Sequence, residues 1–312
     1  MHVAVIGAGN MGCLYGANLA RVGEQVTLVD VWAEHVQAIH EHGLVMEGLH
    51  GEFVAEVAAT TDPDSVSGID LVIVCVNGYN TRTAAEAAQG MLAEDGCVLT
   101  LQNGLGNVEV LTEVFGHDRV VGGLTFHSAD LQAPGQVRHT NKGPTYLGEL
   151  DRARTERLEN IRAAMERAGM QPQVEEDITA TMWGKFVLNC SINPLCAISD
   201  LRPGHIREVD AFDEFQSKII EEVLALIAAK GIQLSDATPL ETIKTYSAKK
   251  FHRVSMQQHL LRGRTTEIDS LNGYVVRESE RLGLCAPYND ALTRIVKGRQ
   301  YQPEGAREHI PE

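Results

Sequence analysis

Hydrophobic positions near the start of the chain follow two alternating patterns. Residues 2–6 form a short β-branched run, which is typical of a buried strand. Apolar residues then recur at helical spacing over 14–20, and after Gly23 a second strand-like run covers 25–29. The order predicts a strand, a helix and a second strand, with a glycine-rich turn between the first two elements.

The same alternation continues to about residue 176. We expect further helices at 33–42, 81–92, 108–115 and 151–168, and strands at 70–76, 97–102, 120–128 and 171–174. Residues 43–61 predict a strand pair at the sheet edge, and 136–139 with 145–149 predict a final hairpin. Such alternation indicates an α/β fold with a doubly wound, mainly parallel sheet.

Strand signals nearly vanish after Asp177, and helical periodicity replaces them. The expected helices cover 178–198, 206–230, 239–251, 256–282 and 287–298. We therefore predict two domains, a dinucleotide-binding domain over 1–176 and an all-helical substrate domain over 177–312. Because ligands of doubly wound sheets bind outside the carboxyl ends of the strands, we expect those ends to face a cleft against the second domain.

Composition narrows the class of protein. The chain has 312 residues, 44% of them hydrophobic, and a net charge of −15, which argues against a nucleic-acid or anionic-membrane binder. Its longest apolar stretch, 69–76, is too short to span a bilayer, and no signal segment is visible. The six cysteines are scattered without a C-x-x-C pair, so we expect reduced thiols in a cytoplasmic protein. We also expect a monomer or a homodimer.

The turn after the first strand carries the first chemical signal, a G-x-G-x-x-G motif. In its strand–turn–helix context, Gly7 permits a tight turn, Gly9 lets the backbone approach a pyrophosphate, and Gly12 allows close packing of helix on strand. The alternative is a glycine turn in an α/β protein that binds no nucleotide. The predicted cofactor-binding residues of the turn are Gly7, Ala8, Gly9, Asn10, Met11 and Gly12.

Asp30 ends the second strand, where an acid can accept hydrogen bonds from the ribose hydroxyls of NAD. A 2′-phosphate normally needs a nearby arginine, but no Lys or Arg occurs between Arg21 and Arg82. We therefore favour NAD(H) over NADP(H); the alternative is that Asp30 only caps the following helix. The basic side chains in this stretch are histidines, which are mostly neutral near pH 7 and so offset a phosphate poorly: His35, His40, His42 and His50.

The helix predicted over 178–198 carries one polar line. Lys185, Asn189 and Asn193 recur every four residues in an otherwise apolar segment and so share a face. One interpretation is a proton-donating lysine with two amides that orient a small polar substrate. The other is a solvent-facing lysine above an amide network between helices.

Two further segments are polar where a site could lie. Residues 101–106 (LQNGLG) end a strand, either as cofactor-contacting residues or as a plain turn. Ser255 is followed by 263–269 (GRTTEID), in which Thr265 or Thr266 can cap a following helix. Asp269 then suits the helix dipole, whereas the role of Glu267 is open.

Together these motifs resemble the ketopantoate reductase (2-dehydropantoate 2-reductase) family over nearly the whole chain. The resemblance implies a Rossmann domain followed by a helical domain like the C-terminal domain of 6-phosphogluconate dehydrogenase. It also implies hydride transfer from a nicotinamide to a 2-oxo acid. By this resemblance Lys185 protonates the developing alkoxide, and Glu267 contacts the substrate or Lys185. The implied substrate-binding residues are Asn189, Asn193, Ser255 and Asn103, and Asn77 and Asn103 meet the cofactor.

Three positions depart from the family pattern. Asn77 stands where a lysine is usual, His259 where an aspartate is usual, and Pro203 where a polar residue is expected. The run 28–35 around Asp30 looks more like the NAD-dependent D-mandelate dehydrogenase branch. We therefore expect ketopantoate reduction, with a D-2-hydroxy-acid dehydrogenase for branched or aromatic substrates as the rival and a non-catalytic NAD sensor as a third possibility. No histidine or cysteine pattern predicts a metal site.

Overall fold

The computed structural model describes residues 1–49 and 51–301, which form two compact units. The first unit is Met1–Met182, and the second begins at Trp183. This division falls inside one long helix, shortly after the boundary at 176 that the change of pattern predicts.

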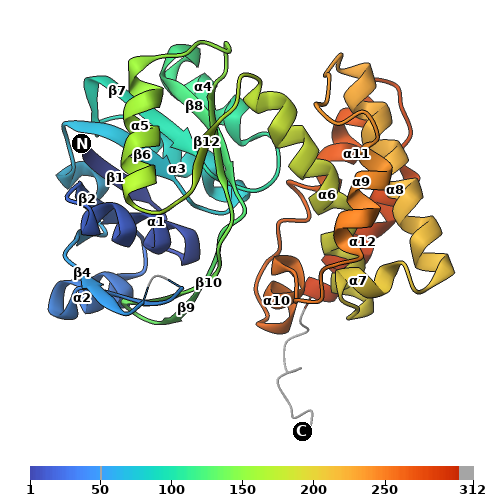
Figure 1. Cartoon of the computed structure of the whole chain (residues 1–312), viewed down its shortest axis with the longest axis horizontal. Coiled ribbons are helices and arrows are strands. Elements are labelled where there is room, and N and C mark those ends of the chain that lie inside the picture. Colours follow the sequence, from blue (N-terminus) through green and yellow to red (C-terminus); the bar gives the residue numbers. More distant parts are fainter. Residues whose placement is uncertain (50, 302–312) are drawn as a thin grey trace, which may run out of the picture. The chain divides into compact units, whose positions relative to one another are not determined.

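The first unit is built on an eight-stranded sheet with the order β12-β11-β8-β7-β6-β1-β2-β5 (Figure 1). Six neighbouring strands, from β5 to β8, are parallel and follow the strand order of a dinucleotide-binding sheet. Beyond them β11 runs antiparallel to β8, and β12 runs parallel to β11. The strands are β1 (His2–Ile6), β2 (Gln25–Val29), β5 (Ala58–Thr60), β6 (Ile69–Val74), β7 (Leu92–Thr100), β8 (Val120–Thr125), β11 (Thr145–Glu149) and β12 (Pro172–Val174).

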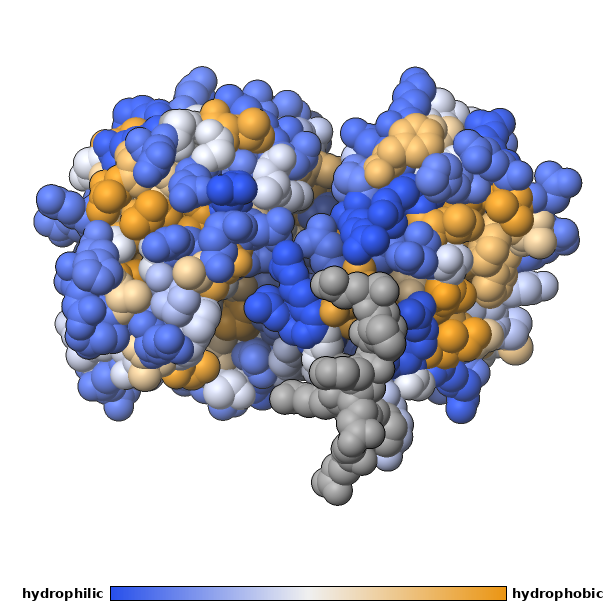
Figure 2. Space-filling view, turned by 90° about the horizontal axis from the view of Figure 1, so that it is seen from below, coloured by the Kyte–Doolittle hydropathy of each residue, from blue (hydrophilic) through white to orange (hydrophobic). Residues whose placement is uncertain are grey.

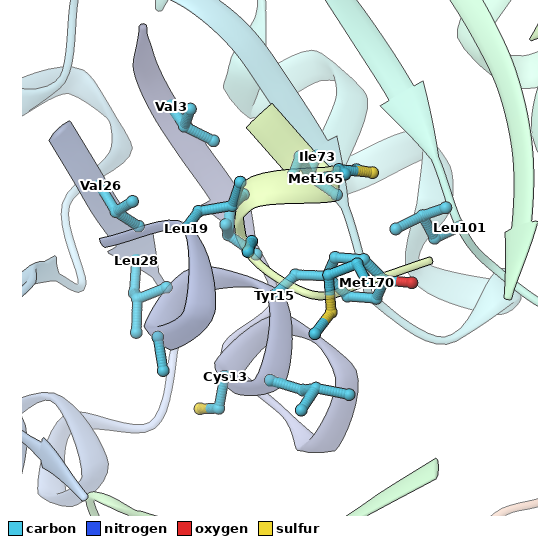
Figure 3. Packing of buried hydrophobic residues seen from close by; sticks show 14 of the residues in the cluster. Val3, Cys13, Tyr15, Leu19, Val26, Leu28, Ile73, Leu101, Met165 and Met170 are labelled. Carbon is cyan, nitrogen blue, oxygen red and sulfur yellow. The ribbon is translucent and has the colours of Figure 1, made fainter. Parts of the chain in front are cut away.

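Helices cover both faces of this sheet. One apolar cluster joins α1, α2 and α5 to one face, and a second joins α3 and α4 to the other. Figure 3 shows Tyr15 and Leu19 of α1 packed with Met165 of α5 and with strand residues. Because the strands are buried on both sides, they read as continuous apolar runs. The helices are α1 (Asn10–Arg21), α2 (Ala33–His42), α3 (Thr81–Ala88), α4 (Asn107–Phe115) and α5 (Glu156–Arg167), with 3-10 turns η1 (Pro63–Ser65), η2 (Gly78–Asn80) and η3 (His117–Arg119).

A separate four-stranded sheet, with the order β4-β3-β10-β9, packs against the outer side of α1. Its strands are β3 (Leu44–Gly48), β4 (Phe53–Ala55), β9 (Ser128–Ala133) and β10 (Gln136–Asn141). The strand pair predicted over 43–61 forms as antiparallel β3 and β4, but its predicted place at the main sheet edge is wrong, and β5 joins that edge instead. The predicted final hairpin is also wrong, because β10 pairs with β9 and β3 while β11 lies in the main sheet. The missed signal is Pro134-Gly135, a turn dipeptide that joins β9 to β10, with Gly135 at φ 71°.

Polar side chains are buried where β8 and β11 approach α1. The Tyr15 hydroxyl donates to the Thr125 hydroxyl at 2.8 Å. His127 Nδ1 lies 3.0 Å from His139 Nε2, and its Nε2 lies 3.1 Å from the Met170 carbonyl oxygen. Burial lowers the pKa of His127, against the Met170 contact, which raises it. This histidine is therefore neutral inside the folded unit at neutral pH.

The second unit is helical throughout its described residues, as the periodicity predicts, with two corrections. The helix expected over 206–230 forms as α8 but begins at Asp210, because Ile206 ends a separate short helix, α7. The one expected over 256–282 is interrupted, because Gly263 adopts φ 63° and α11 begins only after a run of turns. The helices are α6 (Ile178–Ser199), α7 (Pro203–Ile206), α8 (Asp210–Ala229), α9 (Pro239–Ser247), α10 (Ser255–Leu261), α11 (Asn272–Arg281) and α12 (Pro287–Gln300).

Pro194 lies inside α6 and determines how α11 is attached to it. Proline has no N–H, so the carbonyl of Cys190, four residues earlier, loses its helical donor. Asn272, the first residue of α11, replaces that donor with its side-chain amide at 3.1 Å. The same amide donates to Asn289 Oδ1 at 2.8 Å, so one buried side chain ties α6, α11 and α12 together.

Polar side chains predominate on the one face that the space-filling view displays (Figure 2). Figure 2 shows one face of the molecule, on which hydrophilic side chains outnumber scattered hydrophobic ones. Within the described part of the chain, no helix is long and apolar enough to cross a membrane. All six cysteines are free thiols, and Cys285 is the exposed one.

Candidate active site

The glycine turn has the geometry that its sequence predicts. Gly7 adopts φ 93°, and a Cβ there would lie 2.8 Å from the Val76 side chain. A Cβ on Gly12 would lie 2.0 Å from the carbonyl oxygen of Gly7, so helix and strand pack too closely for any side chain. A Cβ on Gly9 would meet nothing within 4 Å. The absence of a side chain at Gly9 leaves open space beside the turn, as an approaching pyrophosphate requires.

The start of α1 supplies donors for such a group. Gly9 is the N-cap residue and provides no side-chain cap, and the first helical bond runs from the Cys13 N–H to the Gly9 carbonyl at 2.9 Å. The first N–H groups of the helix therefore have no partner within it, and they form the positive end of its dipole. Two of the predicted cofactor-binding residues make hydrogen bonds within the protein. The Ala8 N–H donates to Asp30, and the Asn10 amide oxygen accepts from the Leu131 N–H at 2.9 Å.

Asp30 is held in place from two sides. Its Oδ2 accepts the Ala8 N–H at 2.7 Å, and its Oδ1 accepts the Trp32 N–H at 2.9 Å. The carboxylate is thus clamped next to the glycine turn. The alternative that Asp30 only caps the next helix is wrong, because α2 has Trp32 as its N-cap and Asp30 holds the turn instead.

The histidines near Asp30 are engaged within the fold. His35 is fully buried, and its Nδ1 accepts the Gly135 N–H at 2.9 Å. Burial lowers the pKa of His35, against the raising effect of Asp30, so the ring is neutral at pH 7. His40 Nε2 lies 2.5 Å from the Ala59 carbonyl oxygen, and His42 is exposed beside Glu41. His50 lies outside the described residues.

The loops that follow β6 and β7 carry the other predicted cofactor residues. Asn77 is exposed, and its Nδ2 donates to the Tyr79 hydroxyl at 2.8 Å. Asn103 is half-buried in the loop between β7 and α4. The neighbouring Gln102, whose role the sequence did not reveal, is 7% exposed and donates to the Val76 carbonyl oxygen in the loop after β6. Gln102 is a polar residue at the end of a strand expected to be buried, over 97–102, and this feature could have indicated a structural role.

The polar line of α6 exists as predicted. Lys185 and Asn189 are half-buried and Asn193 is 9% exposed. The apolar face of the helix is held by aromatic packing, with Trp183 and Phe186 at ring distances of 6.2 and 5.8 Å from Tyr274 of α11. This packing fixes which way the polar line faces.

Lys185 has the electrostatics of an acid–base group. Burial lowers its pKa from the ordinary 10.5 to about 8, and the negative charge of Glu267 acts in the opposite direction. Glu267 is half-buried in the turns before α11. Hence the fold brings this carboxylate into the field of Lys185, and the lysine can lose or gain its proton near neutral pH.

The remaining predicted residues of the second unit have mixed outcomes. Ser255 is exposed as the first residue of α10. The predicted caps by Thr265 or Thr266 are wrong, because α11 has Leu271 as its N-cap. Asp269 instead forms an ion pair with Lys297 at 2.6 Å.

Two of the departures from the family pattern lie in short helices of the second unit. Pro203 is buried as the first residue of α7. His259 lies in α10, where burial and then Arg264 and Arg262 lower its pKa. Across 1–49 and 51–301 no group of three or more His, Cys, Asp or Glu residues could hold a metal ion.

Comparisons with known proteins agree with this arrangement. The family model "Ketopantoate reductase PanE/ApbA" matches residues 3–152, and its C-terminal model matches 177–300. A 2-dehydropantoate 2-reductase of Pyrococcus horikoshii is 34% identical and covers 98% of this chain and 100% of its own. One from Halobacterium salinarum is 33% identical and covers 95% of this chain and 98% of its own.

Solved structures give the same result. A PanE/ApbA family ketopantoate reductase of Ralstonia eutropha has a TM-score of 0.88 at 33% identity, with 96% of this chain and 98% of that one covered. A D-mandelate dehydrogenase solved with NADH and anilino(oxo)acetate has a TM-score of 0.88 at 27% identity, over 96% of this chain and 98% of that one. The chain therefore belongs to the ketopantoate reductase family and has its two-domain fold.

Proposed function

We propose that this protein is an oxidoreductase that reduces 2-dehydropantoate (ketopantoate) to pantoate with a nicotinamide cofactor. The observation that carries the proposal is Lys185, a lysine whose pKa is lowered to about 8 on the polar line of α6. Curated relatives from two archaea are named for this reaction. The NAD(P) class of cofactor follows from the family and from the glycine turn of the first unit.

When bound, a reduced nicotinamide would supply the hydride that C2 of the 2-oxo acid accepts. The carbonyl oxygen becomes an alkoxide, and protonated Lys185 donates the proton that completes the hydroxyl group. Asn189 and Asn193 lie one and two helical turns further along the same face, where their amides bind the oxygens of a small substrate. Ser255 is exposed for a further hydrogen bond to the substrate.

Glu267 has a supporting role in the proposed mechanism. Its negative charge raises the pKa of Lys185, which burial alone would lower further. The carboxylate thus favours the protonated form of the lysine. A contact between Glu267 and the far hydroxyl of the substrate is also part of the proposal.

We further propose that NADH is preferred over NADPH. Asp30 is clamped by two backbone N–H groups and cannot turn away from the ribose position without losing both. A 2′-phosphate would meet the negative charge of this carboxylate, and the buried, neutral His35 supplies no positive charge to offset it. The D-mandelate dehydrogenase of similar structure was solved with NADH.

A second candidate substrate class has one observation in its favour. Asn77 is neutral where the family usually has a lysine, and its Nδ2 donates to the hydroxyl of the exposed Tyr79. A neutral amide beside an aromatic ring suits a 2-oxo acid with a branched or aromatic side chain. The rival activity is therefore that of an NAD-dependent D-2-hydroxy-acid dehydrogenase.

The test is oxidation of NADH and of NADPH followed by absorbance, with ketopantoate and a panel of branched and aromatic 2-oxo acids. We expect turnover of ketopantoate with a preference for NADH, and a shift toward NADPH in Asp30→Ala. Lys185→Ala should lower kcat by about 10²- to 10⁴-fold, the usual contribution of a general acid. Lys218→Ala, at an exposed lysine of α8, is the matched control.

Three results would overturn parts of this proposal. Undiminished turnover in Lys185→Ala would remove the proton donor. A clear preference of the unaltered protein for NADPH would remove the argument from Asp30. Tight NADH binding without turnover of any oxo acid would indicate a cofactor-sensing protein instead.

A further inference from the structure

Buried polar side chains cross-link the loops that follow β6 and β7. Thr81, Thr100, Gln102 and Asn107 are between 1% and 7% exposed. They come from the start of α3, the end of β7, the loop after it and the start of α4. An unpaired polar group at such depth would cost about 1–3 kcal/mol, so this cluster must satisfy itself.

Gln102 is the centre of the cluster. Its Nε2 donates to the Val76 carbonyl oxygen at 2.7 Å and to the Thr81 hydroxyl at 2.8 Å. Its Oε1 accepts the Thr100 hydroxyl at 3.0 Å. Both N–H groups and the oxygen of one amide are therefore used, and together they bind the β6 loop, α3 and β7.

Two more hydrogen bonds extend the cluster to the start of α4 and back to the loop after β7. The Thr81 hydroxyl donates to Asn107 Oδ1 at 2.7 Å, and Asn107 Nδ2 donates to the Asn103 carbonyl oxygen at 3.1 Å. The two backbone carbonyls at its ends belong to Val76, which precedes Asn77, and to Asn103 itself. The cluster thus sets the backbone position of both predicted cofactor residues.

These loops lie on one side of the point where the strand order reverses. The chain passes from β1 to β2 and β5 on one side and then crosses to β6 and β7 on the other. Dinucleotides bind across such a point at the carboxyl ends of the strands. Asp30, after β2, serves the adenosine half, which leaves the loops after β6 and β7 for the nicotinamide half.

We propose that Gln102 is a positioning residue that holds Asn77 and Asn103 in place for the nicotinamide half of the cofactor. This inference rests on the dinucleotide binding assigned above. Gln102 belongs to the loop after β7 and is hydrogen-bonded to the loop after β6. It needs no contact with the cofactor. Its effect is therefore confined to one half of the dinucleotide.

The experiment compares two ligands, NADH and ADP-ribose, which lacks the nicotinamide. In Gln102→Glu the shape is kept, but a carboxylate oxygen replaces the amide nitrogen and faces the Val76 carbonyl. We expect the Kd of NADH to rise about tenfold, as when about one net hydrogen bond is lost. The Kd of ADP-ribose should stay within about twofold of that of the unaltered protein.

A second pair of variants provides the control. Thr81→Val keeps the shape of the side chain and removes both hydroxyl bonds, whereas Thr81→Ser keeps the hydroxyl. Thr81→Val should weaken NADH binding selectively, and Thr81→Ser should restore it. If Gln102→Glu does not fold, this pair carries the test.

Equal weakening of NADH and ADP-ribose would overturn the inference, because a general loss of structure acts on both ligands. Unchanged NADH binding in both Gln102→Glu and Thr81→Val would overturn it as well. Failure of the proposed reaction is distinguishable, since the unaltered protein would then bind NADH and ADP-ribose but turn over no oxo acid.

Discussion

Replacing Lys185 by methionine should stabilise the protein at neutral pH while it removes the proposed proton donor. Burial lowers the pKa of this lysine from 10.5 to about 8, even though Glu267 acts in the opposite direction. The difference corresponds to about 3 kcal/mol by which the folded state disfavours the charged side chain. Methionine has a similar length and no charge, so this cost disappears in Lys185→Met.

The dependence on pH identifies the cause. Below pH 8 the lysine is protonated in both states, and the full cost is present. Between pH 8 and 10.5 the unfolded chain binds the proton more strongly than the folded chain does, so the stability of the unaltered protein rises with pH. The advantage of Lys185→Met should therefore be largest at pH 7 and vanish above about pH 10.5.

Urea denaturation of both proteins, followed by circular dichroism from pH 7 to 10.5, measures this difference. Oxo-acid reduction by Lys185→Met should at the same time be lower by about 10²- to 10⁴-fold. In the unaltered protein, kcat for reduction should be level below pH 8 and fall above it, as the acid loses its proton. Equal stabilities at pH 7, or an advantage that does not change with pH, would refute the reasoning.

Four further substitutions test single positions. Gly9→Ala should keep its melting temperature, since the added Cβ meets nothing within 4 Å, but a titration should show weaker NADH binding. Gly12→Ala places a Cβ 2.0 Å from a carbonyl oxygen, so its melting temperature should be clearly lower. Asn272→Ala should lower the free energy of unfolding in urea by about 1–3 kcal/mol, because it leaves the Cys190 carbonyl unpaired. Burial lowers the pKa of His127, so stability should fall as pH drops below about 6.5; His127→Gln should flatten that fall in thermal melts between pH 7.5 and 5.

Features encoded by neighbouring residues were predictable from the sequence. The glycine turn depends on backbone conformations that Gly7 needs and on the close packing at Gly12, and both lie within a few residues of each other. The polar line of α6 follows from helical spacing alone, since residues four apart must share a face. The same holds for the change from alternating elements to helices near residue 177.

Errors in the predicted fold arose where the chain pairs over long distances. The pattern of β10 fits any half-buried strand, and its pairing with β3 instead of β11 depends on the face of α1 that this sheet covers. Likewise, residues 256–282 have helical spacing almost throughout. The turns before α11 interrupt that helix where Gly263 is left-handed and Asp269 pairs with Lys297 of α12.

By itself, the sequence predicted a dinucleotide site at the glycine turn, a polar line on one face of α6, and the change from alternating elements to helices near residue 177. These depend on local geometry, which neighbouring residues impose wherever the segment lies. Only the tertiary structure decided that Asp30 clamps the glycine turn, that Gln102 joins two loops, and that Glu267 acts on Lys185. A hydrogen bond or a pKa depends on which groups are brought near and how far water is excluded, and folding determines both.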